Sequence, residues 1–192
     1  MRLPTLHILP LLPLTLITLT TATPHLQPRD TTPFTTGLTT ITAAATTLDV
    51  QILTYPGGDD ISNITAGAAT LINAFLAETK TIQPDFLNAT EAAALLPPLE
   101  TLAAQISVVV ADYIGIHAAI AATAASSDGG WYIYSQLQEE HTAALSYTGS
   151  VVARIPAGEV KDAAAVWAGN ITDTLLDGRD AYKDIAVRPT GY

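Results

Sequence analysis

The sequence contains no cysteine, few basic residues and few aromatic side chains. Without cysteine the chain has no disulfide bond, no thiolate metal site and no cysteine nucleophile, so packing alone must hold the fold together. Only 8 Lys and Arg stand against 18 Asp and Glu, which gives a formal net charge of -10. Because nucleic-acid phosphates are bound by clustered Lys and Arg, we expect no nucleic-acid partner.

The hydrophobic content is high although aromatics are scarce. Hydrophobic residues make up 48% of the 192 residues, while Phe, Trp and Tyr together make up 6%. The chain is therefore long enough and apolar enough for one domain, whose core is built mainly from small and aliphatic side chains.

The N-terminus has the pattern of a secretory signal peptide. Arg2 precedes a Leu-rich apolar stretch from Leu3 to Leu19, and small residues ending at Ala22 form a cleavage site. The predicted organisation is a signal peptide over 1–22, a short propeptide or disordered leader over 23–30, a helical domain over 31–186 and a polar tail over 187–192. The apolar stretch is short for a membrane span and contains three prolines, so we expect no span in the mature protein.

Three Asn-x-Thr sequons follow this leader, at Asn63, Asn88 and Asn170. Sequons behind a signal peptide indicate an N-glycosylated, extracellular protein. The C-terminus has no hydrophobic tail, which argues against a lipid anchor. We expect a secreted protein, released or held in a cell wall by other means.

Apolar residues recur at steps of three and four along most of the chain, which predicts packed helices. Breaks fall at Pro56-Gly57-Gly58, at Pro84, at Pro97-Pro98, at Asp128-Gly129-Gly130 and at Pro156. Short breaks between long helices favour antiparallel neighbours. The predicted fold is all-α, an up-and-down bundle of about five helices.

Motifs for catalysis are missing. The chain has no Gly-x-Ser-x-Gly elbow, no His-Glu-x-x-His helix and no glycine-rich phosphate loop. His117 and His141 could bind a metal only if a carboxylate joined them, and packing is the simpler interpretation. We therefore expect no enzyme activity, no cofactor and no metal site.

Many positions on the apolar faces are Ala, Gly or Thr, and this leaves two physical outcomes open. Small residues either let the helices pack closely or leave a space between them. A dry cavity of several hundred Å³ costs on the order of 10 kcal/mol, which is comparable to the whole stability of a domain. Such a space must hold a ligand, and an elongated apolar tunnel between helices suits a long apolar molecule.

The layout resembles the hydrophobic surface-binding protein A family, which includes fungal cell-wall galactomannoproteins. The resemblance is carried by Arg29-Asp30, Tyr55-Pro56-Gly57-Gly58, Pro97-Pro98-Leu99, Gly129-Gly130 and Arg154-Ile155-Pro156. It implies either a domain that encloses a fatty acid in a central tunnel, or a protein that adsorbs to hydrophobic surfaces and recruits secreted hydrolases. A structural wall glycoprotein without a ligand is a third alternative.

The leading hypothesis is a secreted lipid-binding bundle. Tyr113 or Gln105 could donate a hydrogen bond to a ligand carboxylate, which a negatively charged protein otherwise repels. The candidate lining residues are Leu71, Phe75, Gln105, Ile106, Val109, Val110, Tyr113, Leu137, Leu145, Trp167 and Ile171.

Overall fold

The computed structural model describes residues 31–123 and 128–187, and these residues form helices and connecting turns without a strand. The expected signal peptide and propeptide lie outside the described residues, as does nearly all of the polar tail. The elements in chain order are α1 (Thr32–Leu53), α2 (Ser62–Thr81), the short α3 (Ala89–Ala93), α4 (Leu96–Thr123), α5 (Gly129–Arg154) and α6 (Glu159–Ala181). The prediction of an all-α bundle with five long helices is confirmed.

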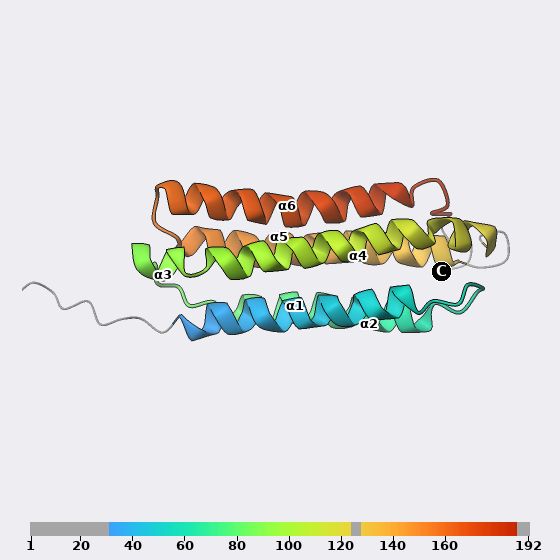
Figure 1. Ribbon diagram of the computed structural model, residues 1–192, viewed down its shortest axis with the longest axis horizontal. Helices are drawn as coiled ribbons and strands as arrows, with labels where there is room; N and C mark the ends of the chain where they lie inside the picture. Colours follow the sequence, from blue (N-terminus) through green and yellow to red (C-terminus); the bar gives the residue numbers. More distant parts are fainter. Residues whose placement is uncertain (1–30, 124–127, 188–192) are drawn as a thin grey trace, which may run out of the picture.

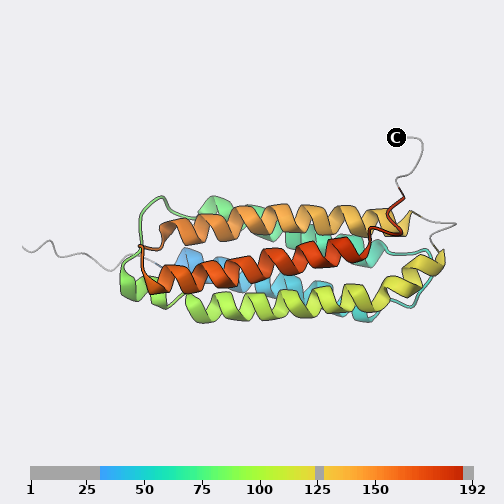
Figure 2. The same cartoon turned by 90° about the horizontal axis from the view of Figure 1, so that it is seen from above.

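The five long helices form a closed ring (Figures 1 and 2). Around the ring the order is α1, α2, α5, α6 and α4, and α4 then packs against α1 again. Successive helices run up and down, as predicted. However, α2 and α4 are not ring neighbours, and α4 touches α5 only slightly because α6 lies between them. The expectation that consecutive helices pack side by side is therefore wrong for these two connections.

The ends of the helices follow local rules of the sequence. Gly57 and Gly58 have φ values of 84° and 98°, a region that side chains disfavour, and they end the first helical segment. Asn88 caps α3 by accepting a hydrogen bond from the Glu91 amide, and the Glu91 carboxylate accepts from the Asn88 amide in return. Pro97 and Pro98 lie in the first turn of α4, where a missing amide donor costs little.

The threonine-rich segment forms the regular helix α1. Hydroxyl groups that face solvent bond to carbonyls one turn earlier, as Thr39 does with Thr35 at 2.8 Å and Thr46 with Thr42 at 2.9 Å. These local bonds satisfy the hydroxyls, so the other face of α1 can pack with Phe34, Leu38, Ile41, Ala45, Leu48 and Ile52 buried.

By length and composition, residues 89–123 could cross a membrane, since an 18-residue window reaches a mean hydropathy of 1.6. The central helix of a soluble protein passes the same test. Here Leu99, Leu102 and Ile106 of α4 are fully buried against the rest of the bundle. Packing within the ring therefore accounts for the apolar character of α4.

Candidate functional site

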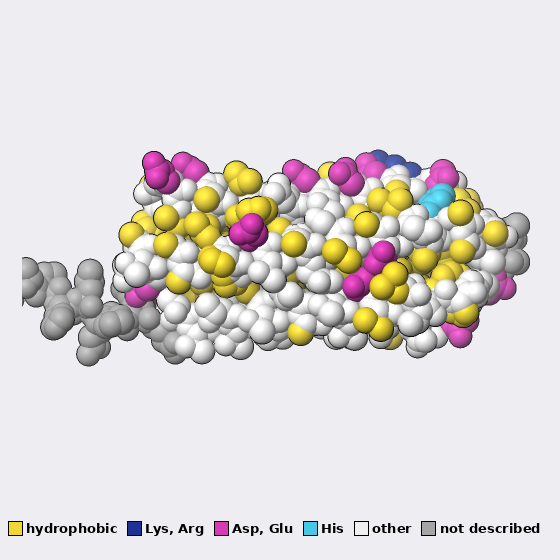
Figure 3. Space-filling view, viewed as in Figure 1, with side chains coloured by type: hydrophobic (Ala, Val, Ile, Leu, Met, Phe, Trp, Pro, Cys, Tyr) yellow, Lys and Arg dark blue, Asp and Glu magenta, His cyan; other side chains and the backbone are white. Residues whose placement is uncertain are grey.

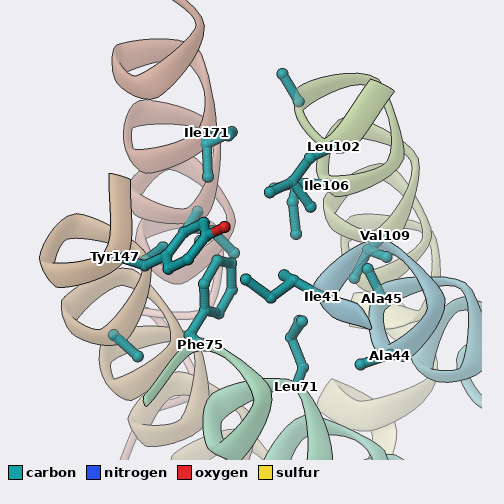
Figure 4. Close-up of a cluster of buried hydrophobic side chains, with 14 of the residues drawn as sticks. Ile41, Ala44, Ala45, Leu71, Phe75, Leu102, Ile106, Val109, Tyr147 and Ile171 are labelled. Atoms are coloured by element: carbon teal, nitrogen blue, oxygen red, sulfur yellow. The ribbon is translucent and has the colours of Figure 1, made fainter. Parts of the chain in front are cut away.

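The centre of the ring is the most enclosed part of the molecule. Neighbouring helix axes are 8–10 Å apart in proteins, so five of them lie about 8 Å from a common centre, against about 6 Å for a square of four. A ring of five therefore encloses a wider interior. Side chains from all five helices point into it, and Figure 4 shows Ile41, Leu71, Phe75, Ile106 and Tyr147 converging there.

Large side chains fill this interior in the absence of a ligand. The largest that are fully buried are Tyr113, Tyr147, Tyr182, Phe34 and Phe75. The rings of Phe75 and Tyr147 meet between α2 and α5, with centroids 6.0 Å apart and planes tilted by 57°. Small side chains are interspersed with them, because each of the five helices buries an alanine at one of the positions Ala45, Ala68, Ala103, Ala144 and Ala164.

Most of the candidate lining residues meet in this core. The following are at most 3% exposed and belong to one contiguous cluster: Leu71, Phe75, Ile106, Val109, Val110, Tyr113, Leu137 and Ile171. Trp167 packs against the cluster while partly exposed. Gln105 is half-buried, and its amide nitrogen is buried without a hydrogen-bond partner. The structure thus gathers these side chains, although it does not show which of them touch a ligand.

Leu145 is a correction, because its side chain is 55% exposed and does not line the interior. The predicted stripe on this helix ran through Tyr134, Leu137, His141 and Leu145. The buried stripe instead runs through Ile133, Leu137, Glu140, Ala144, Tyr147 and Val151. Both sets have helical spacing, and the actual orientation of α5 between α2 and α6 selects the second.

This rotation brings in a residue that the sequence interpretation missed, the carboxyl group of Glu140. Glu140 is fully buried, and its Oε1 accepts a long hydrogen bond of 3.4 Å from the Tyr113 hydroxyl. Burial raises the pKa of Glu140 from its ordinary 4.5 to about 8, although the Tyr113 hydrogen bond opposes the shift. The sequence signal was present, since Glu140 follows Ile133 and Leu137 at steps of seven and three.

Tyr113 is not a free donor, as its hydroxyl already faces Glu140. Burial, followed by the nearby Glu140, raises the pKa of Tyr113 well above 10.0. Its main-chain oxygen accepts a 2.6 Å hydrogen bond from the Tyr182 hydroxyl. Residues from α4, α5 and the end of α6 therefore form one buried polar cluster, which we define as Tyr113, Glu140 and Tyr182.

The outer surface carries shallow grooves. One, of about 520 Å³, lies between α1 and α4 and is lined by Leu38, Thr39, Thr42, Ala43, Thr46, Pro97, Pro98 and Thr101. Another, of about 320 Å³, lies between α4 and α6 and includes Trp167 and Asn170. Figure 3 shows scattered acidic side chains on the face formed by α1, α4 and α6, with basic groups only near the C-terminal half of α6.

The two histidines beyond the leader do not meet. His117 Nε2 lies 3.0 Å from Asp184 Oδ1, and the ring of His117 packs edge-on against Tyr182. Within residues 31–123 and 128–187 there is no group of three His, Cys, Asp or Glu side chains placed to hold a metal ion.

The sequon asparagines Asn63, Asn88 and Asn170 are all exposed. Asn63 lies in the first turn of α2 and Asn170 in the middle of α6. The side-chain oxygen of Asn88 is used in the cap of α3. Capping uses the oxygen, whereas a glycan is attached to the nitrogen.

Comparison with known proteins gives a consistent group of relatives. The chain is 29% identical over 166 residues to cell wall mannoprotein 1 of Aspergillus fumigatus, covering 86% of this chain and 56% of the relative. The chain thus spans about half the length of this curated relative. No protein-family model matches the chain.

Solved structures share the fold. Ligand-binding domain 2 of the Penicillium marneffei MP1 protein, complexed with multiple arachidonic acids, matches with a TM-score of 0.74 and 25% identity. That match covers 81% of this chain and 97% of the domain. Afmp4p in complex with palmitic acid matches with a TM-score of 0.70 and 17% identity, covering 80% of this chain and all of that one.

The ring of five helices is therefore the fold of the helical ligand-binding domains found in these proteins. With its relative from Aspergillus fumigatus, the chain belongs to the family of fungal cell-wall mannoproteins. These relatives are ligand-binding mannoproteins rather than enzymes.

Proposed function

We propose that this chain is a secreted, non-catalytic protein that binds a fatty acid or a similar long-chain amphiphile inside its ring of helices. The observation that carries the proposal is the five-helix ring around an apolar interior, shared with an MP1 domain that was crystallised with arachidonic acids. A long apolar ligand gains free energy from leaving water roughly in proportion to the area it buries.

The composition of the core supports this proposal. Uptake requires the interior side chains to move apart, because the core residues are closely packed around the axis. Alanines on every helix limit the area that is lost when the ring expands, and an alkyl chain replaces the lost contacts. Exposed sequon asparagines and the apolar N-terminal stretch support secretion and glycosylation.

Native mass spectrometry tests the function. The full chain is expressed in a eukaryotic host and measured before and after delipidation. We expect a discrete adduct of fatty-acid mass that disappears on delipidation and returns, with saturation, on addition of arachidonic or palmitic acid. A folded protein that takes up neither acid would refute the proposal, and adsorption to hydrophobic surfaces would then become the working hypothesis.

A matched pair of variants localises the binding. Ala164 is fully buried on α6, whereas its neighbour Ala165 is exposed. Ala164→Leu places three additional carbon atoms in the core and is expected to lower uptake of palmitic acid, while Ala165→Leu should leave uptake unchanged. Circular dichroism must first show that both variants keep the helical fold.

A further inference from the structure

The buried carboxyl group of Glu140 has hydrogen-bonding capacity that the protein does not use. Glu140 is 0% exposed and its Oε2 has no hydrogen-bond partner. Its only side-chain contact through a hydrogen bond is the long one from Tyr113, at 3.4 Å. The ion pairs of the described residues all lie elsewhere, at His117, Arg179 and Lys183, so no cation compensates Glu140.

The position of this carboxyl group is central rather than peripheral. α4 and α5 lie on either side of α6, so the contact between Tyr113 and Glu140 crosses the interior of the ring. One turn away, Gly178 of α6 lies against Val110 and Leu137, where an added Cβ would come within 2.8 Å of a Val110 methyl group. The glycine lets α6 approach both helices closely and brings the polar cluster together.

A purely structural role leaves this arrangement unexplained. A buried polar atom without a partner costs about 1–3 kcal/mol, and apolar replacement of a buried polar pair is often neutral or stabilising. Burial also raises the pKa of Glu140 to about 8, which keeps the group an uncharged acid near neutral pH. In that form it both donates and accepts hydrogen bonds.

We propose that Glu140, assisted by Tyr113, is the head-group site of the interior and selects long-chain ligands whose head is an uncharged hydrogen-bonding group. An alcohol hydroxyl or an undissociated carboxyl group fits this description. A carboxylate does not, because it would enter an interior without a compensating cation and would face an acid. The inference deepens the proposed function and rests on it.

The position of the polar cluster gives the ligand an orientation. The alkyl chain would extend from Glu140 toward the Phe75 and Tyr147 region, since Tyr147 lies two turns further along α5. The Tyr182 hydroxyl fixes the main chain at Tyr113 and is a positioning group, not a contact of the ligand.

The test compares three probes of equal chain length: hexadecanol, hexadecane and palmitate. Each displaces the uncharged fluorophore N-phenyl-1-naphthylamine from the full-length, delipidated protein at one near-neutral pH. We expect the wild-type protein to bind hexadecanol about tenfold more tightly than hexadecane, the effect of one good buried hydrogen bond. Palmitate should bind more weakly than hexadecanol.

Variants of Glu140 distinguish the site from general packing. Glu140→Leu should abolish the preference for hexadecanol over hexadecane while hexadecane still binds. Glu140→Gln cannot ionise and donates through its amide, so it should improve palmitate binding relative to hexadecanol. The matched control is Thr148→Val on the same helix, because Thr148 is also buried but its hydroxyl already bonds to the Ala144 carbonyl at 2.8 Å.

The outcomes separate this inference from the proposed function. If the wild-type protein binds none of the probes, the binding function itself fails and the head-group site with it. If the probes bind but the hexadecanol preference is absent, or persists in Glu140→Leu, the head-group site alone is refuted. If Glu140→Leu does not fold, Glu140→Gln decides, and an unchanged ratio of palmitate to hexadecanol affinity refutes the selectivity.

Discussion

The hydroxyl group of Tyr182 donates a 2.6 Å hydrogen bond to the main-chain oxygen of Tyr113, and both side chains are fully buried. Tyr182 is the residue that follows the last turn of α6, whereas Tyr113 lies deep within α4. The bond therefore ties the C-terminal end of the bundle to its central helix. It also holds in place the residue that faces Glu140.

Removal of this hydroxyl should weaken the fold. Tyr182→Phe deletes one buried hydrogen bond, and we expect a loss of about 1 kcal/mol in the free energy of unfolding. Chemical denaturation followed by circular dichroism measures the effect. Tyr132→Phe is the control, since Tyr132 is 43% exposed on α5. Equal stability of the two variants would show that the Tyr182 bond contributes nothing.

Gly178 is required for the close approach of α6 to α4. A methyl group there would lie 2.8 Å from a Val110 carbon, so Gly178→Ala should destabilise the protein by about 1–2 kcal/mol despite its better helix propensity. By contrast, Gly149 on α5 has open space around it, and Gly149→Ala should stabilise by about 0.5–1 kcal/mol. Thermal unfolding of both variants checks the opposite signs; stabilisation by Gly178→Ala would contradict the tight contact.

The stability of the protein should depend on pH through Glu140. Its pKa in the folded protein is about 8 because of burial, above the ordinary 4.5, so the folded state binds this proton more tightly than the unfolded chain. The stabilisation is complete below the ordinary pKa and is lost as the pH rises toward 8, at up to about 1.4 kcal/mol per pH unit.

Urea unfolding across this pH range measures the slope, and Glu140→Gln removes the group that titrates. We expect the variant to lose less stability than the wild-type protein as the pH rises, and to be the more stable of the two above pH 8. Parallel curves for the two proteins would mean that Glu140 does not titrate within this range.

A second carboxyl pair links α1 to α4. The hydrogen bond from Asp49, together with some burial and the charge of Asp49, raises the pKa of Asp112 to about 6. The pair therefore favours folding when it shares a proton and disfavours it as the pH rises through 6. Asp112→Asn should raise the melting temperature at pH 7.5 and have little effect near pH 4.5. Asp173→Asn, at an exposed position of α6, is the control; an equal shift in both variants would indicate a general charge effect.

Asn88 combines a helix cap with a sequon, and two substitutions separate these roles. Asn88→Ala removes both and should destabilise the protein by about 1 kcal/mol. Asn88→Asp retains the oxygen that accepts from the Glu91 amide but cannot carry a glycan. In a eukaryotic host we expect both variants to lose the same glycan mass and only Asn88→Ala to lose cap stability. Identical masses for all three proteins would show that Asn88 is not glycosylated.

The sequence predicted the helices and most of the core because both depend on spacing along the chain. Leu38, Ile64, Ile106 and Ile171 recur with helical period, and all of them are buried. The lining prediction failed at Leu145, where two stripes of equal spacing compete. Local pattern could not choose between them, since the choice depends on where α2 and α6 lie.

The arrangement of the helices was equally beyond the local pattern. Short breaks suggested that consecutive helices are neighbours, yet α6 lies between α4 and α5. α3 lies in the connection from α2 to α4, and those two helices are not ring neighbours. The number of helices was therefore predictable, whereas their order around the ring was not.

By itself the sequence determined where the helices begin and end, which faces are apolar and which chemistries are missing, because proline, glycine, caps and periodicity act over a few residues. Only the tertiary structure decided that five helices close into a ring and that α5 turns Glu140 inward toward Tyr113. The physical reason is that a helix with two nearly equivalent apolar faces buries the one that its neighbours, distant in sequence, can cover.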